Sequence, residues 1–327
     1  MQTKLQESNI TKEDTVLFVH IPKTAGSTMV AIINPIFKGE LRCPHYYTHE
    51  LSGMSFEEIR RYRYYIGHFH YGAMEPLLPP GFLCFTILRN PVSQYISRFY
   101  HHQRFNNFKR FENQKAFYLD LINEIPKIQT MSLLEFVDND SLKFARSSRN
   151  EQYSSLGRLF DLDPSGQFQV KFKTPDKWVD IEVVKQRLAS MSCFGLTERF
   201  QDSLFLLCYT FGWEPILETQ RLNANPNPTS HDKIDPETLQ RIEAVNNFDM
   251  ELYKFARPLF ERRFLQMCHE LLERYGDRTD AFLNPSLSQE VIIKLLKRHY
   301  QARRQTPNFI RVSKKIFAPL LQKIYKK

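Results

Sequence analysis

The 327-residue sequence contains no long apolar run. No stretch approaches the roughly 18–20 consecutive apolar residues that a membrane-spanning helix needs. The first 14 residues are polar, without the apolar core of a secretory signal peptide. We therefore expect a protein that is made and kept in the cytoplasm.

Cysteine is scarce, and its spacing shows no pairing. The five cysteines form no Cys-x-x-Cys motif, and Cys84, Cys193 and Cys208 stand inside apolar runs. Cysteines in such positions are typical of small core residues rather than of disulfides or metal ligands. This usage favours a reducing, intracellular compartment.

Most of the chain has no excess of positive over negative charge, although the formal net charge is +9. Residues 282–327 hold eleven Lys or Arg against one acid, Glu290, which is a local balance of +10 and leaves about −1 for residues 1–281. A diffuse nucleic-acid-binding surface is therefore excluded. The pattern predicts a nearly neutral domain with a basic appendage.

The sequence also lacks the Gly-x-x-x-x-Gly-Lys-Ser/Thr motif of ATP- and GTP-binding loops. Residues 16–28 nevertheless carry a related pattern: the apolar run Val-Leu-Phe-Val-His-Ile ends in Pro-Lys-Thr-Ala-Gly-Ser-Thr and continues into a helical stretch at 29–33. A buried strand, a small-residue loop and a helix N-terminus form an anion site, because backbone N–H groups and the helix dipole attract negative charge. Lys23 adds a charge at its mouth.

A second strand-to-helix unit spans residues 82–104. The apolar run 82–88 is typical of a strand in a parallel sheet covered on both faces. It ends in Arg89-Asn90-Pro91, and Pro91 suits the first turn of the helix that follows. Arg89 and Ser97, two turns into that helix, can hold a second phosphate.

Together these motifs resemble the sulfotransferase superfamily that uses 3′-phosphoadenosine-5′-phosphosulfate (PAPS). The most similar branch contains the heparan and uronyl 2-O-sulfotransferases and their bacterial relatives. Weaker matches are Gly67-His68-Phe69-His70, Phe194 to Glu198 and the Phe- and Tyr-rich stretch 248–260, so the resemblance covers about residues 14–265. It implies that the loop holds the 5′-phosphosulfate and Arg89 with Ser97 holds the 3′-phosphate. The implied donor-binding residues are Pro22, Lys23, Thr24, Ala25, Gly26, Ser27, Thr28, Arg89 and Ser97.

Sulfuryl transfer requires in-line positioning and neutralisation of the leaving phosphate. We expect Lys23 to stabilise the leaving group, and we expect no metal because the donor leaves as a good anion. The competing interpretation makes Lys23 a solvated loop lysine, Gly26 a turn former, and Arg89 and Ser97 structural residues. We expect the neighbouring Arg98 to point elsewhere.

A hydroxyl acceptor needs a base with a pKa near neutrality, which favours histidine. The resemblance places the base at His68, with His70 positioning the acceptor. If the strand continues through them, both lie on one face. The alternatives are a metal site, although no cluster of Cys or acids completes a ligand set, and two hydrogen-bonded structural histidines. We expect His20 to be structural.

We predict an α/β fold, a P-loop-like, doubly wound parallel sheet flanked by helices. Its parts are a polar segment (1–14), a sulfotransferase domain (15–281) and a basic amphipathic tail (282–327). A helical insertion at 105–190 is the expected site of acceptor recognition. The tail either lies on an anionic membrane surface or packs on the domain.

The predicted function is transfer of a sulfuryl group from PAPS to a hydroxyl of a carbohydrate or glycolipid. Eukaryotic members of the branch are membrane-anchored; without that anchor the chain is expected to be bacterial and cytoplasmic, which weakens the case for a glycosaminoglycan acceptor. One alternative is a P-loop kinase-like phosphotransferase, which needs a Walker-type lysine and a magnesium-binding acid. Another is a non-catalytic nucleotide-binding or membrane-adaptor protein.

Overall fold

The computed structural model describes most of the chain. The described residues are 10, 13–37, 39, 41–105, 115–160, 167–168, 177–216, 234–277 and 288–304, with the backbone alone for 115–122. The predicted segment 1–14 lies almost wholly outside this set, as do residues 217–233 and the tail beyond residue 304.

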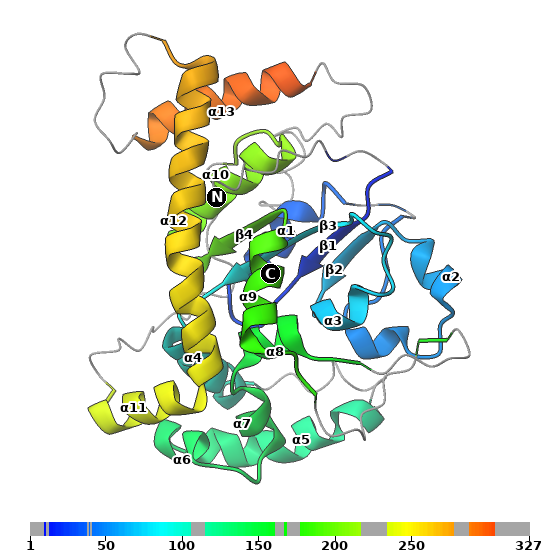
Figure 1. Cartoon of the computed structure of the whole chain (residues 1–327). Coiled ribbons are helices and arrows are strands. Elements are labelled where there is room, and N and C mark those ends of the chain that lie inside the picture. The colour runs from blue at the N-terminus through cyan, green and yellow to red at the C-terminus, as the bar shows by residue number, and fades with distance from the viewer. Residues whose placement is uncertain are drawn as a thin grey trace, which may run out of the picture.

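A four-stranded parallel sheet lies at the centre of the molecule (Figure 1). Its order is β2-β1-β3-β4, and every strand residue is buried. The strands are β1 (Val16–Val19), β2 (Tyr64–Gly67), β3 (Leu83–Leu88) and β4 (Cys193–Leu196). Strands buried on both faces require a helical layer on each side.

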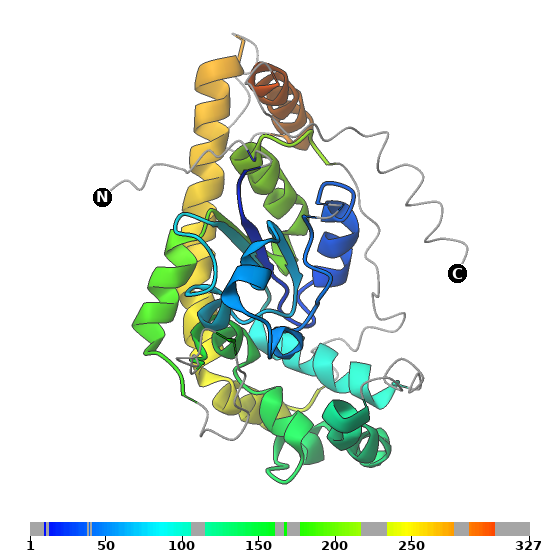
Figure 2. The same cartoon turned by 90° about the vertical axis from the view of Figure 1, so that its right-hand side faces the viewer.

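Helices supply these layers on both sides of the sheet (Figures 1 and 2). The α-helices are α1 (Gly26–Ile33), α2 (Phe56–Arg60), α3 (Tyr71–Met74), α4 (Pro91–Gln103), α5 (Lys115–Thr130), α6 (Leu133–Val137), α7 (Lys143–Ser147), α8 (Glu151–Gly157), α9 (Ile181–Ser190), α10 (Phe200–Phe211), α11 (Pro236–Val245), α12 (Asn247–Tyr275) and α13 (Gln289–Arg303). Two 3₁₀ turns are η1 (Thr48–Leu51) and η3 (Thr197–Arg199). The predicted α/β fold with a doubly wound parallel sheet is confirmed.

Two helix boundaries differ from what the sequence favours. The stretch 236–263 favours one long helix broken at Pro258, but the break lies at Asn246 and Pro258 stands inside α12. The Asn246 side chain explains the break, because its Nδ2 donates to the Ile242 carbonyl while its Oδ1 accepts from the Asn150 amide. Thr197 does not cap α10: it begins η3, and its Oγ1 donates to the Leu88 carbonyl.

The strand order places a topological switch point at β1. From β1 the chain goes to β2 on one side and then crosses to β3 on the other. Because all four strands are parallel, their carboxyl ends share one edge, where ligands bind in folds of this type. The segments after β1, β2 and β3 carry the candidate residues, so the fold brings them to the same edge.

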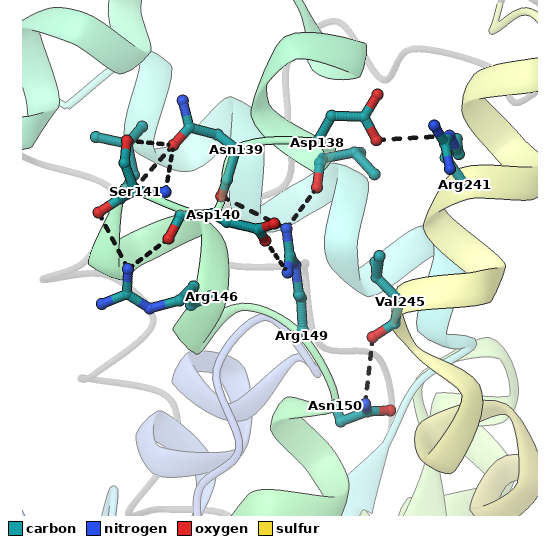
Figure 3. Close-up of polar contacts among 11 residues, drawn as sticks. Asp138, Asn139, Asp140, Ser141, Arg146, Arg149, Asn150, Arg241 and Val245 are labelled. Atoms are coloured by element: carbon teal, nitrogen blue, oxygen red, sulfur yellow. Dashed lines mark hydrogen bonds and ion pairs between the residues drawn. The ribbon is translucent and has the colours of Figure 1, made fainter.

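The turn before α8 ties the helical insertion to the rest of the domain (Figure 3). Arg149 Nη1 lies 2.6 Å from Asp140 Oδ1, and Nη2 donates to the Val137 carbonyl at 2.8 Å. The next residue, Asn150, has a left-handed backbone with φ 49° and donates from Nδ2 to the Val245 carbonyl at 3.2 Å. The turn therefore joins the end of α6 to the end of α11.

The start of α8 is capped by a residue of α12. Buried Asp249 accepts the amide N–H of Gln152 at 3.1 Å and that of Tyr153 at 2.6 Å. In return, the Asp249 amide donates to Asn150 Oδ1 at 3.0 Å. This reciprocal pair fixes α8, whose first two residues reach the candidate site.

Helix α13, the described part of the basic tail, packs on the domain. Its apolar residues Val291, Ile292, Leu295 and Leu296 join the main hydrophobic core, and α13 contacts α10 and α12. Arg303 donates to the Tyr209 carbonyl near the end of α10, where a cation complements the helix dipole. Packing on the domain is thus the correct alternative for this helix.

We predict that Asp249→Ala destabilises the protein more than loss of an exposed cap does. Two buried N–H groups lose a charged acceptor, which lowers the free energy of unfolding by about 3 kcal/mol. The control Asp180→Ala removes the exposed cap of α9, which accepts from Glu182 N, at a cost of about 1 kcal/mol. Urea unfolding measures both, and equal effects would contradict the anchoring role of Asp249.

Candidate active site

The loop between β1 and α1 has its carbonyl oxygens tied back. Thr24 Oγ1 donates to the Ile21 carbonyl at 2.9 Å, Gln94 Nε2 to the Pro22 carbonyl at 2.9 Å, and Arg89 Nη1 to the Lys23 carbonyl at 2.9 Å. Three successive carbonyls are therefore engaged by protein donors. An anion can then meet the amide side of the loop without carbonyl repulsion.

The loop adopts a strained backbone that opens the start of α1. Lys23 and Ala25 have positive φ angles of 64° and 63°, which non-glycine residues rarely adopt. Ala25 stands at the N-cap of α1 and provides no side-chain bond to the first helical amides. Ser27 is exposed, whereas Thr24 and Thr28 are buried. Because Ala25 provides no side-chain cap, the N-terminus of α1 is suited to an anion.

Gly26 is required by the neighbouring ring of His20. A Cβ at position 26 would lie 1.8 Å from His20 Cδ2 and 2.0 Å from its Nε2. His20 is itself buried, its Nδ1 lies 2.5 Å from the Tyr46 hydroxyl, and its amide donates to the Gly67 carbonyl. Burial, helped by the nearby His68 and Lys23 charges, lowers the pKa of His20 well below its usual value. The predicted structural role of His20 fits this packing.

Arg89 is held at the end of β3 by a residue of α8. Gln152 Oε1 accepts the Arg89 amide at 2.9 Å, and Gln152 Nε2 donates to the Arg89 carbonyl at 2.8 Å. Asn90 caps α4 by accepting the Ser93 amide, and Ser97 lies partly exposed two turns into that helix. Arg89 and the loop thus meet directly, through the bond from its guanidinium to the Lys23 carbonyl.

Positive charge is concentrated around Lys23. Its pKa is lowered to about 8, first by burial and then by the charges of Arg98, Arg89 and Arg104, while Glu151 alone raises it. Three arginine charges therefore act on Lys23 against one carboxylate. Arg98, which we expected to point elsewhere, pairs with this carboxylate: its Nη2 lies 3.0 Å from Glu151 Oε1. Such an excess of like charge favours a polyvalent anion.

His68 lies immediately after β2, next to the loop. Its Nδ1 is 2.5 Å from the His20 carbonyl, which can only accept, so Nδ1 carries the proton. In the neutral ring Nε2 is then the basic atom. The ring stacks on His20 at 4.2 Å and on Tyr47 at 5.3 Å between centroids. Its backbone N–H donates to the Tyr46 carbonyl at 2.7 Å.

His70 is placed differently, because the strand does not continue through it. Strand β2 ends at Gly67, and His70 stands at the N-cap of α3. Its Nδ1 lies 3.2 Å from Thr48 Oγ1, which accepts the His70 backbone N–H at 2.9 Å. Burial and the nearby Arg158 charge lower the pKa of His70 to about 3. The predicted common strand face of His68 and His70 is therefore wrong.

Several site residues had no signal in the sequence. Gln94, Glu151 and Gln152 are separated from the loop by many residues, and no short motif marks them. Only the i, i+4 spacing of Gln94 and Arg98 on one face of α4 could have suggested a shared role. Among the described side chains, no group of three or more His, Cys, Asp or Glu is arranged to hold a metal ion. No helix in the described ranges is long and apolar enough to cross a bilayer.

The fold is of the class expected for a P-loop-like sulfotransferase, and Arg89 at the end of β3 contacts the β1–α1 loop. No protein-family model matches the chain. Known proteins are nevertheless similar. The chain is 32% identical over 187 residues (55% of this chain, 38% of the relative) to "Heparan-sulfate 6-O-sulfotransferase 2" of Danio rerio. It is 32% identical over 195 residues (57% and 46%) to the Gallus gallus protein of that name.

A human relative shows a similar level of identity: "Heparan-sulfate 6-O-sulfotransferase 1" is 29% identical over 194 residues, 57% of this chain and 45% of that protein. The chain thus spans less than half the length of these curated relatives. The predicted resemblance to PAPS-dependent sulfotransferases, in a heparan-sulfate sulfotransferase-like branch, is confirmed. The matched relatives are named 6-O-sulfotransferases, whereas the sequence motifs resemble the branch that contains the 2-O-sulfotransferases.

We predict that Gly26→Ala disrupts the site. The added Cβ must displace the His20 ring, which contacts both Tyr46 and His68, so nucleotide affinity should fall at least tenfold and the protein should lose about 1–3 kcal/mol of stability. The matched control is Ala25→Gly, which relieves the positive φ and should be neutral or stabilising. Thermal melting and nucleotide titration measure both variants. A tolerated Gly26→Ala would show that the His20 ring is free to move.

Proposed function

We propose that this protein is a PAPS-dependent O-sulfotransferase that acts on a hydroxyl of a carbohydrate. The observation that carries the proposal is the loop with three engaged carbonyls at the N-terminus of α1, where the charges of Arg98, Arg89 and Arg104 all act on Lys23. A donor with a 5′-phosphosulfate and a 3′-phosphate matches this excess of positive charge. The similarity to heparan-sulfate 6-O-sulfotransferases supports the same donor and a carbohydrate acceptor.

In this proposal the residues divide between the two ends of the donor. The loop from Pro22 to Thr28 would receive the 5′-phosphosulfate on its amides, and Arg89 with Ser97 would receive the 3′-phosphate. Arg89 is well suited, because Gln152 holds its backbone while its guanidinium reaches the Lys23 carbonyl. A planar guanidinium binds phosphate with paired hydrogen bonds.

Bound PAPS supplies the sulfuryl group, which passes in line from the phosphate oxygen to the acceptor oxygen. Lys23 neutralises the charge that grows on that phosphate oxygen as its bond to sulfur breaks. A leaving phosphate beside Lys23 also favours the protonated ammonium, which restores the pKa that burial and the other cations depress. The proposal needs no metal for this step.

His68 accepts the proton of the acceptor hydroxyl. Because Nδ1 donates to the His20 carbonyl, Nε2 presents a lone pair, and the resulting imidazolium is stabilised by that same carbonyl. Stacking on His20 and Tyr47 fixes the ring orientation. His70, with its depressed pKa, is not a second base; it positions the Thr48 turn beside His68.

An edge of aromatic and basic residues next to His70 is the proposed acceptor platform. Phe160 lies 5.3 Å from the His70 ring, and the Arg158 guanidinium lies over Phe160 at 5.7 Å. The backbone of Arg158 forms an isolated antiparallel β-bridge with that of Trp178, a residue that is 43% exposed. Exposed indole faces stack on sugar rings, and an arginine suits an acidic sugar. A heparan-type glycan is therefore our first acceptor candidate, and a glycolipid the second.

Membrane contact by the basic tail stays a prediction. The apolar side of α13 is used in packing on α10 and α12, so this helix does not offer it to lipid. Residues 305–327, which hold the remaining basic cluster, lie outside the described part of the chain. Removal of residues 305–327 leaves α13 in place and is the appropriate truncation for a vesicle-binding assay.

We predict that His68→Ala lowers turnover of PAPS with a heparan-type acceptor by roughly 10²–10⁴-fold, the range expected for loss of a general base. The affinity for 3′-phosphoadenosine 5′-phosphate should be retained. His269→Ala, an exposed position on α12, is the control and should behave as the unchanged protein. Unchanged turnover of His68→Ala, or weakened nucleotide binding alone, would contradict the assignment of His68 as the base.

We predict that Trp178→Ala raises the acceptor KM about tenfold, which corresponds to the loss of one aromatic stacking contact. Nucleotide affinity should not change and stability should change little, because Trp178 is an exposed residue outside the hydrophobic core. Leu265→Ala removes another exposed apolar side chain, 57% exposed on α12, and serves as the control. An unchanged acceptor KM with every glycan tested would remove Trp178 from the acceptor platform.

A further inference from the structure

Glu151, the first residue of α8, is a buried carboxylate at the centre of the cation cluster. Its Oε1 lies 3.0 Å from Arg98 Nη2, and its Oε2 accepts from Gln94 Nε2 at 3.2 Å. The same Gln94 amide donates to the Pro22 carbonyl at 2.9 Å. One carboxylate therefore connects α8, α4 and the loop.

The spacing along α4 explains why one acid can serve both partners. Gln94 and Arg98 are four residues apart, so they lie on the same face of the helix. His102 is one turn further along that face and is 4% exposed. This face of α4 runs past the loop toward Arg104, which is its C-cap residue.

Two buried polar atoms on this face have no partner. Among the described residues, neither Arg98 Nε nor His102 Nε2 finds a hydrogen-bond partner. A buried donor left unpaired costs about 1–3 kcal/mol, so such atoms point to a group that binds there. Arg98 uses Nη2 to bind Glu151, so its other guanidinium N–H groups can donate to an anion.

The charge of Arg98 acts on Lys23. Among the charged neighbours that lower the Lys23 pKa, Arg98 has the largest effect, ahead of Arg89. Burial raises the pKa of Glu151 to about 7, and Arg98 is the largest opposing influence. The Arg98 charge therefore favours the ionised form of Glu151.

Building on the proposed function, we propose that Arg98 is a further donor-binding residue beside Lys23 and Arg89, and that Glu151 is the positioning residue that holds it. Glu151 acts through Arg98 and Gln94 and does not itself touch the donor.

The sign of one substitution separates positioning from simple charge. Glu151→Gln removes a negative charge beside an anion site, so a bystander carboxylate would give tighter nucleotide binding. If Glu151 positions Arg98, the same substitution weakens binding, because the guanidinium loses its fixed orientation. Gln keeps the shape and can still accept from Gln94.

The test is calorimetric titration of 3′-phosphoadenosine 5′-phosphate into the full chain and its variants. Arg98→Gln should weaken binding at least tenfold, the size expected for loss of a charge-assisted hydrogen bond. Arg98→Lys should lie in between, because it keeps the charge and loses the Nε donor. Arg61→Gln removes an exposed arginine that pairs with Glu57 and is the control.

Glu151→Gln should weaken binding about tenfold, and in the Arg98→Gln background it should weaken binding no further. Thermal melting checks that each variant is folded; if Arg98→Gln is not, Arg98→Lys and Glu151→Gln carry the test. Tighter binding by Glu151→Gln, or unchanged binding by the Arg98 variants, overturns this inference while leaving the donor site in place. Failure of the unsubstituted protein to bind the bisphosphate overturns the proposed function itself.

Discussion

The candidate site depends on hydrogen bonds to three consecutive carbonyl oxygens of the β1–α1 loop. Thr24, Gln94 and Arg89 donate to the carbonyls of Ile21, Pro22 and Lys23. With the carbonyls engaged, an anion can approach the start of α1, where Ala25 provides no side-chain cap. The rest of the structure supports these donors: Gln152 holds the backbone of Arg89, and Glu151 accepts from Gln94. Asp249 in turn caps α8, the helix that carries both Glu151 and Gln152.

A second constraint connects the donor loop to the candidate base. The His20 ring fills the space that a side chain at Gly26 would need, and it stacks on His68 at 4.2 Å. The His20 carbonyl also fixes the tautomer of His68. Loop geometry and base orientation therefore depend on one buried histidine, so a change at the loop is transmitted to the base without a conformational change elsewhere.

Much of the fold could be predicted because its signals are local. The apolar runs at 16–21 and 82–88 gave the two central strands, and Pro91 marked the start of α4. The strand-loop-helix order gave the sheet and the edge where the site lies. His68 and Arg89 were identified by motifs that directly follow strands.

The remainder depends on contacts between distant segments. Glu151 meets Gln94 across 57 residues and Gln152 meets Arg89 across 63, and neither pair has a sequence pattern. The break at Asn246 arises because its side chain bonds Asn150, which is 96 residues away. The direction of the Arg98 side chain could not be predicted for the same reason, because it is set by Glu151, a buried acid on α8 that no local pattern reveals.

The most direct test of the central claim is calorimetric titration of the unsubstituted protein with 3′-phosphoadenosine 5′-phosphate, beside ATP with magnesium. The account predicts tight binding of the bisphosphate and weak or no binding of ATP, because it assigns the two phosphates to separate subsites, one at the loop and one at Arg89 with Ser97, and the sequence lacks a Walker-type motif. Binding of ATP with magnesium alone would favour a phosphotransferase. Binding of neither nucleotide would contradict the donor site and with it the proposed sulfotransferase activity.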